Sequence, residues 1–281
     1  MNESIVGSTE IIVPLDGRDP SVRAVPVAVR LARRIGIPTR LFSTSYDPDE
    51  QLRWLQAIAK LYSVNDDVSV SVSDSDDPAE AITDTVGTTG LVCMATAASL
   101  LPHQGHIGSV AEDVIRKVRR PVALVGPKVE RQPGSETERV VVPVDGSELS
   151  ESALNVSADL AEILGVPLWI VSVVSHRAAA AFAAQVESPS SLVESSYVNR
   201  LARDLATQRN FAAEFDVLHG DDPTRAILDF TGDNGTVVMS THGRSGLSRL
   251  FGGSVATGVV AHSKRAVFVW RPDESSLRSA E

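Results

Sequence analysis

The sequence predicts an α/β protein that consists of two tandem open five-stranded parallel-sheet domains, and three observations support this fold class. First, the chain repeats itself: Ile11–Ser21 (IIVPLDGRDPS) returns as Val140–Ser150 (VVVPVDGSELS), and Asp76–Ile82 (DDPAEAI) returns as Asp221–Ile227 (DDPTRAI). Second, short apolar runs alternate with helical patterns within each repeat. Third, these runs are apolar throughout, which predicts parallel strands covered by helices on both faces of the sheet.

The repeats also predict where the domains begin and end. We expect one domain at residues 9–127 and a second at residues 137–272, joined by the polar segment Gly126–Arg139. The first eight and the last nine residues are predicted to be loose polar tails. The offset between matched residues grows from 129 (11 to 140) to 145 (76 to 221), so 16 extra residues lie within 175–196. This insertion is either an ordinary helix or flap, or a lid over a ligand site.

The second repeat contains each expected element in turn. Residues 139–144 (RVVVPV) predict a buried strand, which Asp145-Gly146 ends. Ser147 can cap the next helix, whose apolar face includes Leu149, Ala153, Leu160 and Leu164. The remaining elements are a helix end at Gly165 and Pro167, a strand over 168–174, a helix through 197–208, a strand within 213–220, a helix after Pro223, a strand over 235–240, a helix over 254–262 and a last strand over 266–270.

Composition limits the classes of ligand and the cellular setting. The chain has 281 residues and a net charge of −10, which argues against nucleic acid as the main ligand because that ligand needs a basic face. Its single cysteine, Cys93, cannot form an internal disulfide and is predicted to be a small core residue. No apolar run is long enough to span a bilayer, and the N-terminus lacks a signal-peptide pattern. We therefore expect a cytoplasmic protein without a membrane partner.

Two loops are predicted at the carboxyl edge of the second sheet, where ligands of open parallel sheets bind. One follows the first strand and carries Asp145, and the other lies in the glycine-rich stretch Met239–Val260 (MSTHGRSGLSRLFGGSVATGVV). This stretch reaches a helix at Gly253-Ser254, where free amides can accept phosphate oxygens and Ser254 is a natural N-cap. Glycine allows a phosphate to approach closely, and Arg244 or Arg249 can add positive charge. The alternative interpretation is a flexible connection followed by a capped helix.

Both repeats resemble universal stress proteins almost from end to end. ATP-binding members of that family carry the pattern Gly, two residues, Gly, nine residues, Gly, then Ser or Thr. The second repeat has Ser240, two residues, Gly243, nine residues, Gly253 and Ser254, so only the first glycine departs from the pattern. The resemblance implies a Rossmann-like sheet of the adenine nucleotide alpha hydrolase-like type with strand order 3-2-1-4-5. It also implies an adenine site near the end of the second strand, around Ser172–Val174.

The resemblance further implies that ATP, with Mg²⁺, binds mainly in the second domain. The residues then expected to bind it are Pro143, Asp145, Val173, Ser240, His242, Gly243, Arg244, Gly253, Ser254 and Val255. No catalytic residue and no metal site built from protein ligands alone are expected, so any ATP hydrolysis should be slow and the chain is predicted not to be an enzyme. Neither GRSGL nor GGSVA fits the nucleophile elbow G-x-S-x-G, and His103 and His106 lack a carboxylate neighbour for zinc.

The first repeat is predicted to hold a weaker site. It keeps Asp16 and the spacing of Ala98, nine residues, Gly108 and Ser109, but Ala98 replaces a glycine of the motif. An added Cβ costs about 1 kcal/mol or more where the backbone needs a positive φ or lies against a phosphate. We expect Ser109 and Glu112 to form a capping box, and the first domain to serve structure.

Three functions remain open at this point. The first is an ATP-binding stress-response or signalling switch that acts on a signalling protein of unknown identity. The second is a non-nucleotide interaction module, because family members pair through their last strands, here PVALV and AVFVW. That pairing predicts an intramolecular pseudo-dimer or a homo-oligomer. The third is a nucleotide-cleaving enzyme related by fold. Bound nucleotide separates the first two, and turnover separates the third.

Overall fold

Ten strands form one sheet, five from each repeat. The first repeat supplies β1 (Glu10–Pro14), β2 (Thr39–Thr44), β3 (Val68–Ser73), β4 (Gly90–Ala95) and β5 (Val122–Val125). The second supplies β6 (Arg139–Pro143), β7 (Leu168–Val174), β8 (Glu214–His219), β9 (Gly235–Ser240) and β10 (Val267–Trp270). The strand order is β3-β2-β1-β4-β5-β10-β9-β6-β7-β8, so each half has the order 3-2-1-4-5. The predicted fold class is confirmed. The computed structural model describes residues 4–96, 107–130, 136–176, 190–241 and 254–272.

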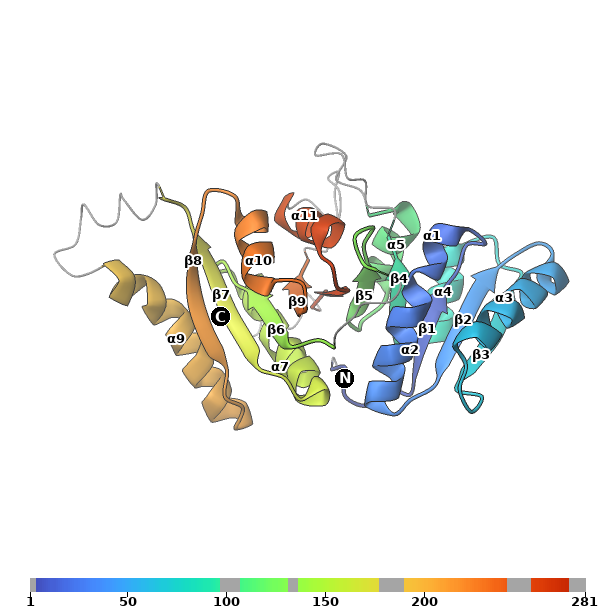
Figure 1. Cartoon of the computed structure of the whole chain (residues 1–281), viewed down its shortest axis with the longest axis horizontal. Coiled ribbons are helices and arrows are strands. Elements are labelled where there is room, and N and C mark those ends of the chain that lie inside the picture. The colour runs from blue at the N-terminus through green and yellow to red at the C-terminus, as the bar shows by residue number, and fades with distance from the viewer. Residues whose placement is uncertain (1–3, 97–106, 131–135, 177–189, 242–253, 273–281) are drawn as a thin grey trace.

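Helices cover both faces of this sheet (Figure 1). The first half holds α1 (Asp19–Val22), α2 (Ala24–Ile35), α3 (Pro48–Tyr62), α4 (Pro78–Val86) and α5 (Ser109–Lys117). The second half holds α6 (Glu148–Glu151), α7 (Ala153–Leu164), α9 (Ser190–Arg209), α10 (Pro223–Thr231) and α11 (Ser254–His262). One hydrophobic cluster packs α2, α3, α7 and α9 against the sheet, and a second packs α4, α5, α10 and α11 against the other face. In Figure 1, α3 and α9 lie at opposite ends of the molecule.

Polar caps in the sequence set where several helices begin. The Asp77 carboxylate accepts hydrogen bonds from the backbone N–H groups of Ala79 and Glu80 at the start of α4, and Asp222 accepts one from Arg225 at the start of α10. Ser147 accepts from the backbone of Ser150 and caps a helix as predicted, but the single helix expected up to Leu164 is divided into α6 and α7. These caps satisfy amides that the first turn of a helix leaves without partners.

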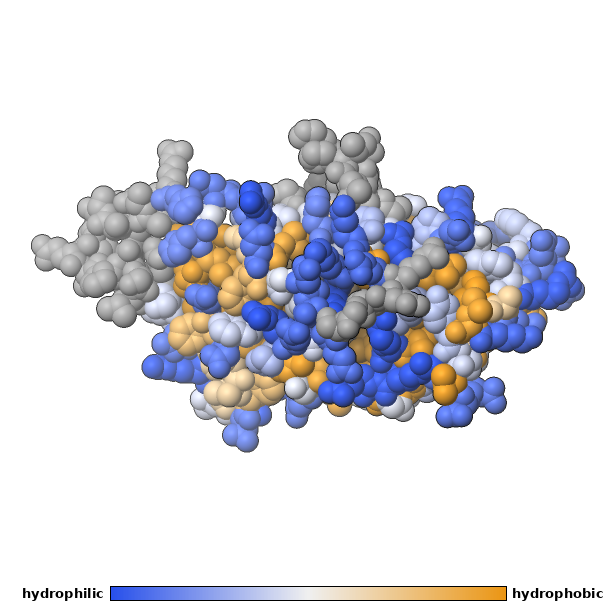
Figure 2. Space-filling model, in the orientation of Figure 1, coloured by the Kyte–Doolittle hydropathy of each residue, from blue (hydrophilic) through white to orange (hydrophobic). Residues whose placement is uncertain are grey.

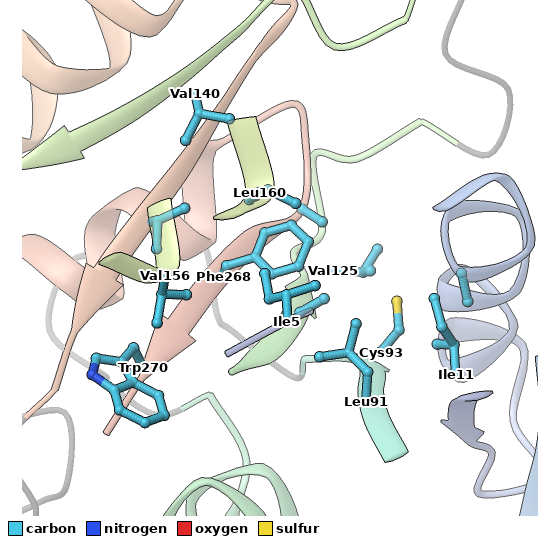
Figure 3. Packing of buried hydrophobic residues seen from close by; sticks show 14 of the residues in the cluster. Ile5, Ile11, Leu91, Cys93, Val125, Val140, Val156, Leu160, Phe268 and Trp270 are labelled. Atoms are coloured by element: carbon cyan, nitrogen blue, oxygen red, sulfur yellow. The ribbon is translucent and has the colours of Figure 1, made fainter. Parts of the chain in front are cut away.

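The two halves join through their last strands. β5 and β10 pair antiparallel, with Val122 opposite Val269, Ala123 opposite Phe268, and Leu124 opposite Val267. Ala123 and Phe268 are equivalent positions of the two repeats, so the pseudo-twofold axis of the duplication passes through this pair. Figure 3 shows Phe268 in the cluster that also contains Ile5, Leu160 and Val125. The predicted intramolecular pseudo-dimer is therefore present in the chain.

A second contact between the halves requires a glycine. A Cβ placed on Gly126, which follows β5, would lie 2.0 Å from the carbonyl oxygen of Val260 in α11. Any other residue would therefore force the backbones apart. Arg271, at the position equivalent to Gly126, donates a hydrogen bond to the backbone carbonyl of Arg116 in the other half. The two equivalent positions thus join the halves in different ways.

The structure corrects four predictions about segment ends. Within the expected loose tail, Ile5 is fully buried and Ser4 donates a hydrogen bond to Asp159 of α7, because the tail packs between the halves. Within the expected linker, Val129 is also buried. The helix expected through 197–208 begins earlier, at the start of α9. The expected capping box at Ser109 does not form, because α5 begins at Ser109 itself and Gly108 is the N-cap.

Candidate functional site

The second half has a topological switch point between β6 and β9. β6 pairs in parallel with β7 on one side and with β9 on the other. The chain therefore leaves β6 toward one side of the sheet and returns beside it at β9 on the other side. Loops that follow the carboxyl ends of two such strands diverge, which leaves a place for a ligand outside the sheet edge. The two predicted loops follow Pro143, the last residue of β6, and Ser240, the last residue of β9.

The loop after β6 is held in shape by hydrogen bonds to Asp145. Its Oδ1 atom accepts hydrogen bonds from the Ser147 backbone N–H at 3.1 Å and from the Ser147 hydroxyl at 2.6 Å. The Asp145 N–H donates to Ser150 Oγ at 3.2 Å. Partial burial opposes ionisation of Asp145, but hydrogen bonding with Ser147 and Ser150 outweighs it, so the pKa of this carboxyl lies below its ordinary value. Asp145 is therefore a charged acceptor on an exposed loop.

A pair of serines connects the end of α6, the helix that follows the Asp145 loop, to the end of β9. Ser152, between α6 and α7, lies with its Oγ atom 3.1 Å from Ser240 Oγ at the end of β9. The Ser152 hydroxyl donates to the carbonyl of Leu149 at 2.6 Å, so Ser240 supplies the proton between the two hydroxyls. On the far side of β9, the Thr241 N–H donates to the carbonyl of Trp270 in β10 at 2.9 Å. The end of β9 is thus fixed from both neighbours.

Tyr197 of α9 reaches over the same loop. Its hydroxyl accepts a hydrogen bond from the Gly146 N–H at 3.1 Å and donates one to Glu151 Oε1 at 2.8 Å. Burial raises the pKa of Tyr197, and the Glu151 carboxylate raises it further, so the phenol keeps its proton at neutral pH. The Arg200 guanidinium lies 5.6 Å from the centre of the Tyr197 ring. α9 is in this way attached to the loop that carries Asp145.

The first half repeats the Asp loop but not the tyrosine. Asp16 Oδ1 accepts from the Arg18 N–H at 3.0 Å, and the Asp16 N–H donates to Ser21 Oγ at 3.4 Å. The glycine that follows each aspartate has a left-handed backbone, with φ of +80° at Gly17 and +86° at Gly146. The residue equivalent to Tyr197 by the offset of 145 is Leu52, which has no hydroxyl. The two halves therefore share the loop and differ in what covers it.

The structure brings some of the predicted site residues to this edge. Pro143 and Ser240 end their strands, Val173 lies near the end of β7, and Val255 lies in the first turn of α11. Ser254 is the first residue of α11, and its predicted role as the N-cap stays a prediction because Gly253 lies outside the described residues. His242, Gly243, Arg244 and Gly253, together with Ala98 of the first half, lie outside the described residues.

Sequence reasoning missed the three side chains that support the loops. Tyr197, Glu151 and Ser152 belong to no motif, and the repeat comparison places different residues at the equivalent positions. They could have been found only from the packing of α9 against the carboxyl edge.

Other predicted features fall outside this site. Cys93 is fully buried, as predicted, and burial raises the pKa of its thiol to about 12. Among the described residues, no group of three or more His, Cys, Asp or Glu side chains could hold a metal ion. His103 and His106 lie outside the described residues. In the part of the chain that the structure describes, every helix is too short or too polar to cross a bilayer.

The fold defines a tandem open α/β protein. Each half has a topological switch point, the place where ligands of such sheets bind. Residues 136–271 match the model of the Universal stress protein family. Universal stress proteins of Mycobacterium tuberculosis and Mycobacterium bovis are 31% identical to this chain over 180 residues, which is 60% of the chain. The match spans 57% of the length of each relative. Residues 136–271 are therefore a universal stress protein domain, and the chain is UspA-like.

Solved structures agree on the fold of the whole chain. A universal stress protein from Archaeoglobus fulgidus superimposes with a TM-score of 0.65 at 17% identity, covering 98% of this chain and all of that one. The cytoplasmic domain of a prokaryotic cation chloride cotransporter has a TM-score of 0.54 at 14% identity, covering 97% and 99% of the two chains. At these identities the likeness concerns the fold alone, and one fold serves several functions.

Proposed function

We propose that the second half of the chain binds ATP, with Mg²⁺, at the carboxyl edge of β6 and β9, and acts as a switch in the stress response. The observation that supports this best is the 3.1 Å contact between Ser152 Oγ and Ser240 Oγ. It holds the end of α6, the helix that follows the Asp145 loop, against the end of β9 at the switch point. The proposed domains are residues 9–127 and 137–272, in a cytoplasmic protein.

The residues at this edge fit the parts of a nucleotide. Asp145 is an ionised acceptor that suits the hydroxyl or amino groups of a nucleoside. The N-terminus of α11, at Ser254, presents free amides that suit phosphate oxygens. Bound Mg²⁺ would take its oxygen ligands from the phosphates and water, which is how Mg²⁺ is commonly held beside nucleotides. Pro143, Val173 and Val255 are partly buried apolar residues at or near the ends of β6 and β7 and in the first turn of α11, and we assign them to the apolar part of the site.

The switch requires a segment that responds to the ligand. Residues 244–252 separate the two parts of the sequence motif, so contacts of ATP with Gly243, Gly253 and Ser254 act on both ends of that segment. A signalling partner that reads its surface would then sense whether ATP is bound. We assign no residue as a general base for ATP hydrolysis. In this proposal the switch therefore changes state when ATP binds and when it is released.

Equivalent positions in the two halves supply a matched test. Gly243→Val places a β-branched side chain in the motif, and Ala98→Val makes the corresponding change in the first half. Isothermal titration with Mg-ATP should show at least a tenfold loss of affinity in Gly243→Val and less than a twofold change in Ala98→Val. Equal losses, or retained affinity in Gly243→Val, would place the site elsewhere. Circular dichroism melts of both variants serve as the folding control.

The second candidate function is a non-nucleotide interaction module. The antiparallel pairing of β5 with β10 favours it, because that pairing makes one rigid sheet from two domains without any ligand. A chain that binds no adenine nucleotide at millimolar Mg-ATP would favour this function over the switch.

A further inference from the structure

A cavity of about 510 Å³ lies where the two halves meet, away from the site described above. α2 of the first half contributes Arg30, Arg33 and Arg34 to its lining, and the second half contributes Leu164, Arg265 and Phe268. Its volume falls within the range of small-molecule sites. None of the described residues that line it belongs to the proposed ATP site. On the face seen in Figure 2, hydrophilic residues gather over the middle of the molecule, between the two halves.

Four of the described residues that line the cavity are arginines, and three of these form hydrogen bonds or ion pairs with other residues of the chain. Arg33 Nε forms an ion pair with Asp67 Oδ2 at 2.6 Å. Arg34 Nη2 donates to the carbonyl of Leu164 at 2.8 Å, which ties α2 to the end of α7 in the other half. Arg265 donates to the carbonyl of Asp233 at 3.1 Å and to the Asn234 side chain at 2.9 Å. These three guanidinium groups therefore build the wall of the cavity.

Arg30 differs from the other three. It makes no hydrogen bond or ion pair to any residue that the structure describes. Partial burial lowers the pKa of its guanidinium, and the positive charge of Arg265 lowers it further. The nearby Cys93 thiol carries no charge at neutral pH because burial raises its pKa to about 12. Arg30 is still protonated at that pH, so it brings an uncompensated positive charge to the cavity.

The remaining lining is mostly apolar. Val27, Leu31, Leu164 and Phe268 face the cavity from both halves, and Glu136 is the one acidic side chain among the described lining residues. Transfer of a hydrocarbon or aromatic group from water to such a surface is favourable. A guanidinium whose donors have no partner among the described residues, beside apolar walls, suits a ligand with one anionic group and an apolar body.

We propose that this cavity is a binding site for a small amphipathic carboxylate, with Arg30 as the residue that pairs with the carboxylate. The apolar body lies against α2 and Phe268, and the ligand touches both halves of the chain. The site is separate from the proposed ATP site and does not depend on it.

Octanoate is a suitable probe, and 1-octanol is its uncharged counterpart. Isothermal titration of the full chain should show saturable binding of one octanoate per chain. Arg30→Gln removes the charge at a side chain without a described partner and should weaken octanoate binding at least tenfold. The wild-type chain should bind 1-octanol at least tenfold more weakly than octanoate, and Arg30→Gln should remove that preference.

Two further variants separate the cavity from general surface binding. Arg53→Gln neutralises an exposed arginine of α3 that does not line the cavity, and octanoate affinity should stay within twofold of wild type. Val27→Trp fills the cavity from α2 without changing charge, and it should weaken octanoate and 1-octanol alike. Thermal melts establish that each variant is folded.

The proposal is overturned if octanoate shows no saturable binding, or if Arg30→Gln binds it as tightly as wild type. Saturating Mg-ATP serves as a competitor in the same titration. Unchanged octanoate affinity in its presence is expected, whereas competitive loss would place octanoate in the ATP site and overturn the assignment to this cavity. Failure of ATP to bind at all contradicts only the proposed function and leaves the octanoate result to be judged by itself.

Discussion

The two halves of the molecule have the same framework and different side chains at the same carboxyl edge. Each places an aspartate after its first strand, a glycine with positive φ behind it, and a serine hydroxyl on the aspartate N–H. Only the second half covers this loop with a tyrosine, and only it keeps the second glycine of the sequence motif. The comparison shows that a duplicated backbone survives while the side chains at its carboxyl edge diverge.

The pair at the pseudo-twofold axis shows the same divergence in the core. In a symmetric dimer the central position of the antiparallel pair would face its own copy, whereas here Ala123 faces Phe268. Side chains directly opposite in an antiparallel pair lie close enough to pack on each other. A small residue opposite a large one can therefore fill the space between the halves. A single chain permits this asymmetry because the two positions can mutate independently.

Exchanging these two residues should give the largest effect. Phe268→Ala should cost about 3–5 kcal/mol of unfolding free energy by leaving a cavity, and Ala123→Phe about 1–3 kcal/mol by overpacking. The double exchange should cost less than the sum of the single changes, with a coupling on the order of 1 kcal/mol or more. Chemical denaturation of the four proteins measures this cycle. Strictly additive costs would mean that the two side chains do not pack as a pair.

The equivalent aspartates should differ in their effect on ATP. Asp145→Ala removes an ionised acceptor from the proposed site, and hydrogen bonds to charged groups contribute about 1.5–3 kcal/mol, or roughly 10- to 100-fold in affinity. Asp16→Ala should change ATP affinity less than twofold. Titration calorimetry on both variants compares the halves directly. A larger loss in Asp16→Ala would reverse the assignment of the sites.

Removal of the Tyr197 hydroxyl should have a smaller effect. Tyr197→Phe loses the hydrogen bonds with Gly146 and Glu151 and should lower the unfolding free energy by about 0.5–1.5 kcal/mol. Tyr62→Phe, at the end of α3, is the control because the Tyr62 hydroxyl bonds to no described residue. Denaturant unfolding of the two variants measures the difference. Equal stability of both would mean that α9 is not attached through this hydroxyl.

The pH dependence of Asp145 should be the smallest effect. Its pKa in the folded chain lies below the ordinary value of 3.8, so the ionised form stabilises the fold. That contribution is complete above the ordinary pKa and is lost as the pH falls through the folded pKa. The melting temperature of Asp145→Asn should thus lie slightly below that of wild type at pH 7, and the gap should close below pH 3.8. A gap that grows toward acid pH would contradict the lowered pKa.

Most of the fold could be predicted from the sequence because periodicity and repetition act locally. Strands such as β9 and helices such as α11 have the bounds that apolar runs and turn residues predict. Errors arose where tertiary packing decides. Ile5 is buried because it fills the space between the halves, and Ser109 lies inside α5 because Gly108 takes the cap. Neither outcome is visible from neighbouring residues alone.

The candidate site was predictable in part. The motif and the duplication point to Asp145 and Ser240, whereas the contact of Ser152 with Ser240 depends on how β6 and β9 lie side by side. Tyr197 comes from a helix on the other side of the insertion, so no local pattern relates it to Gly146. Residues of both halves line the cavity around Arg30, so the sequence of a single repeat cannot predict it.

The central claim is that one framework carries two unequal sites, and the number of nucleotides per chain tests it most directly. The full chain is loaded with Mg-ATP, freed of unbound ligand and denatured, and the released adenine nucleotide is then counted by chromatography. The account predicts one nucleotide per chain in wild type and in Ala98→Val, and none in Gly243→Val. Two per chain in wild type would show that both halves bind ATP, and none after loading would contradict the proposed switch.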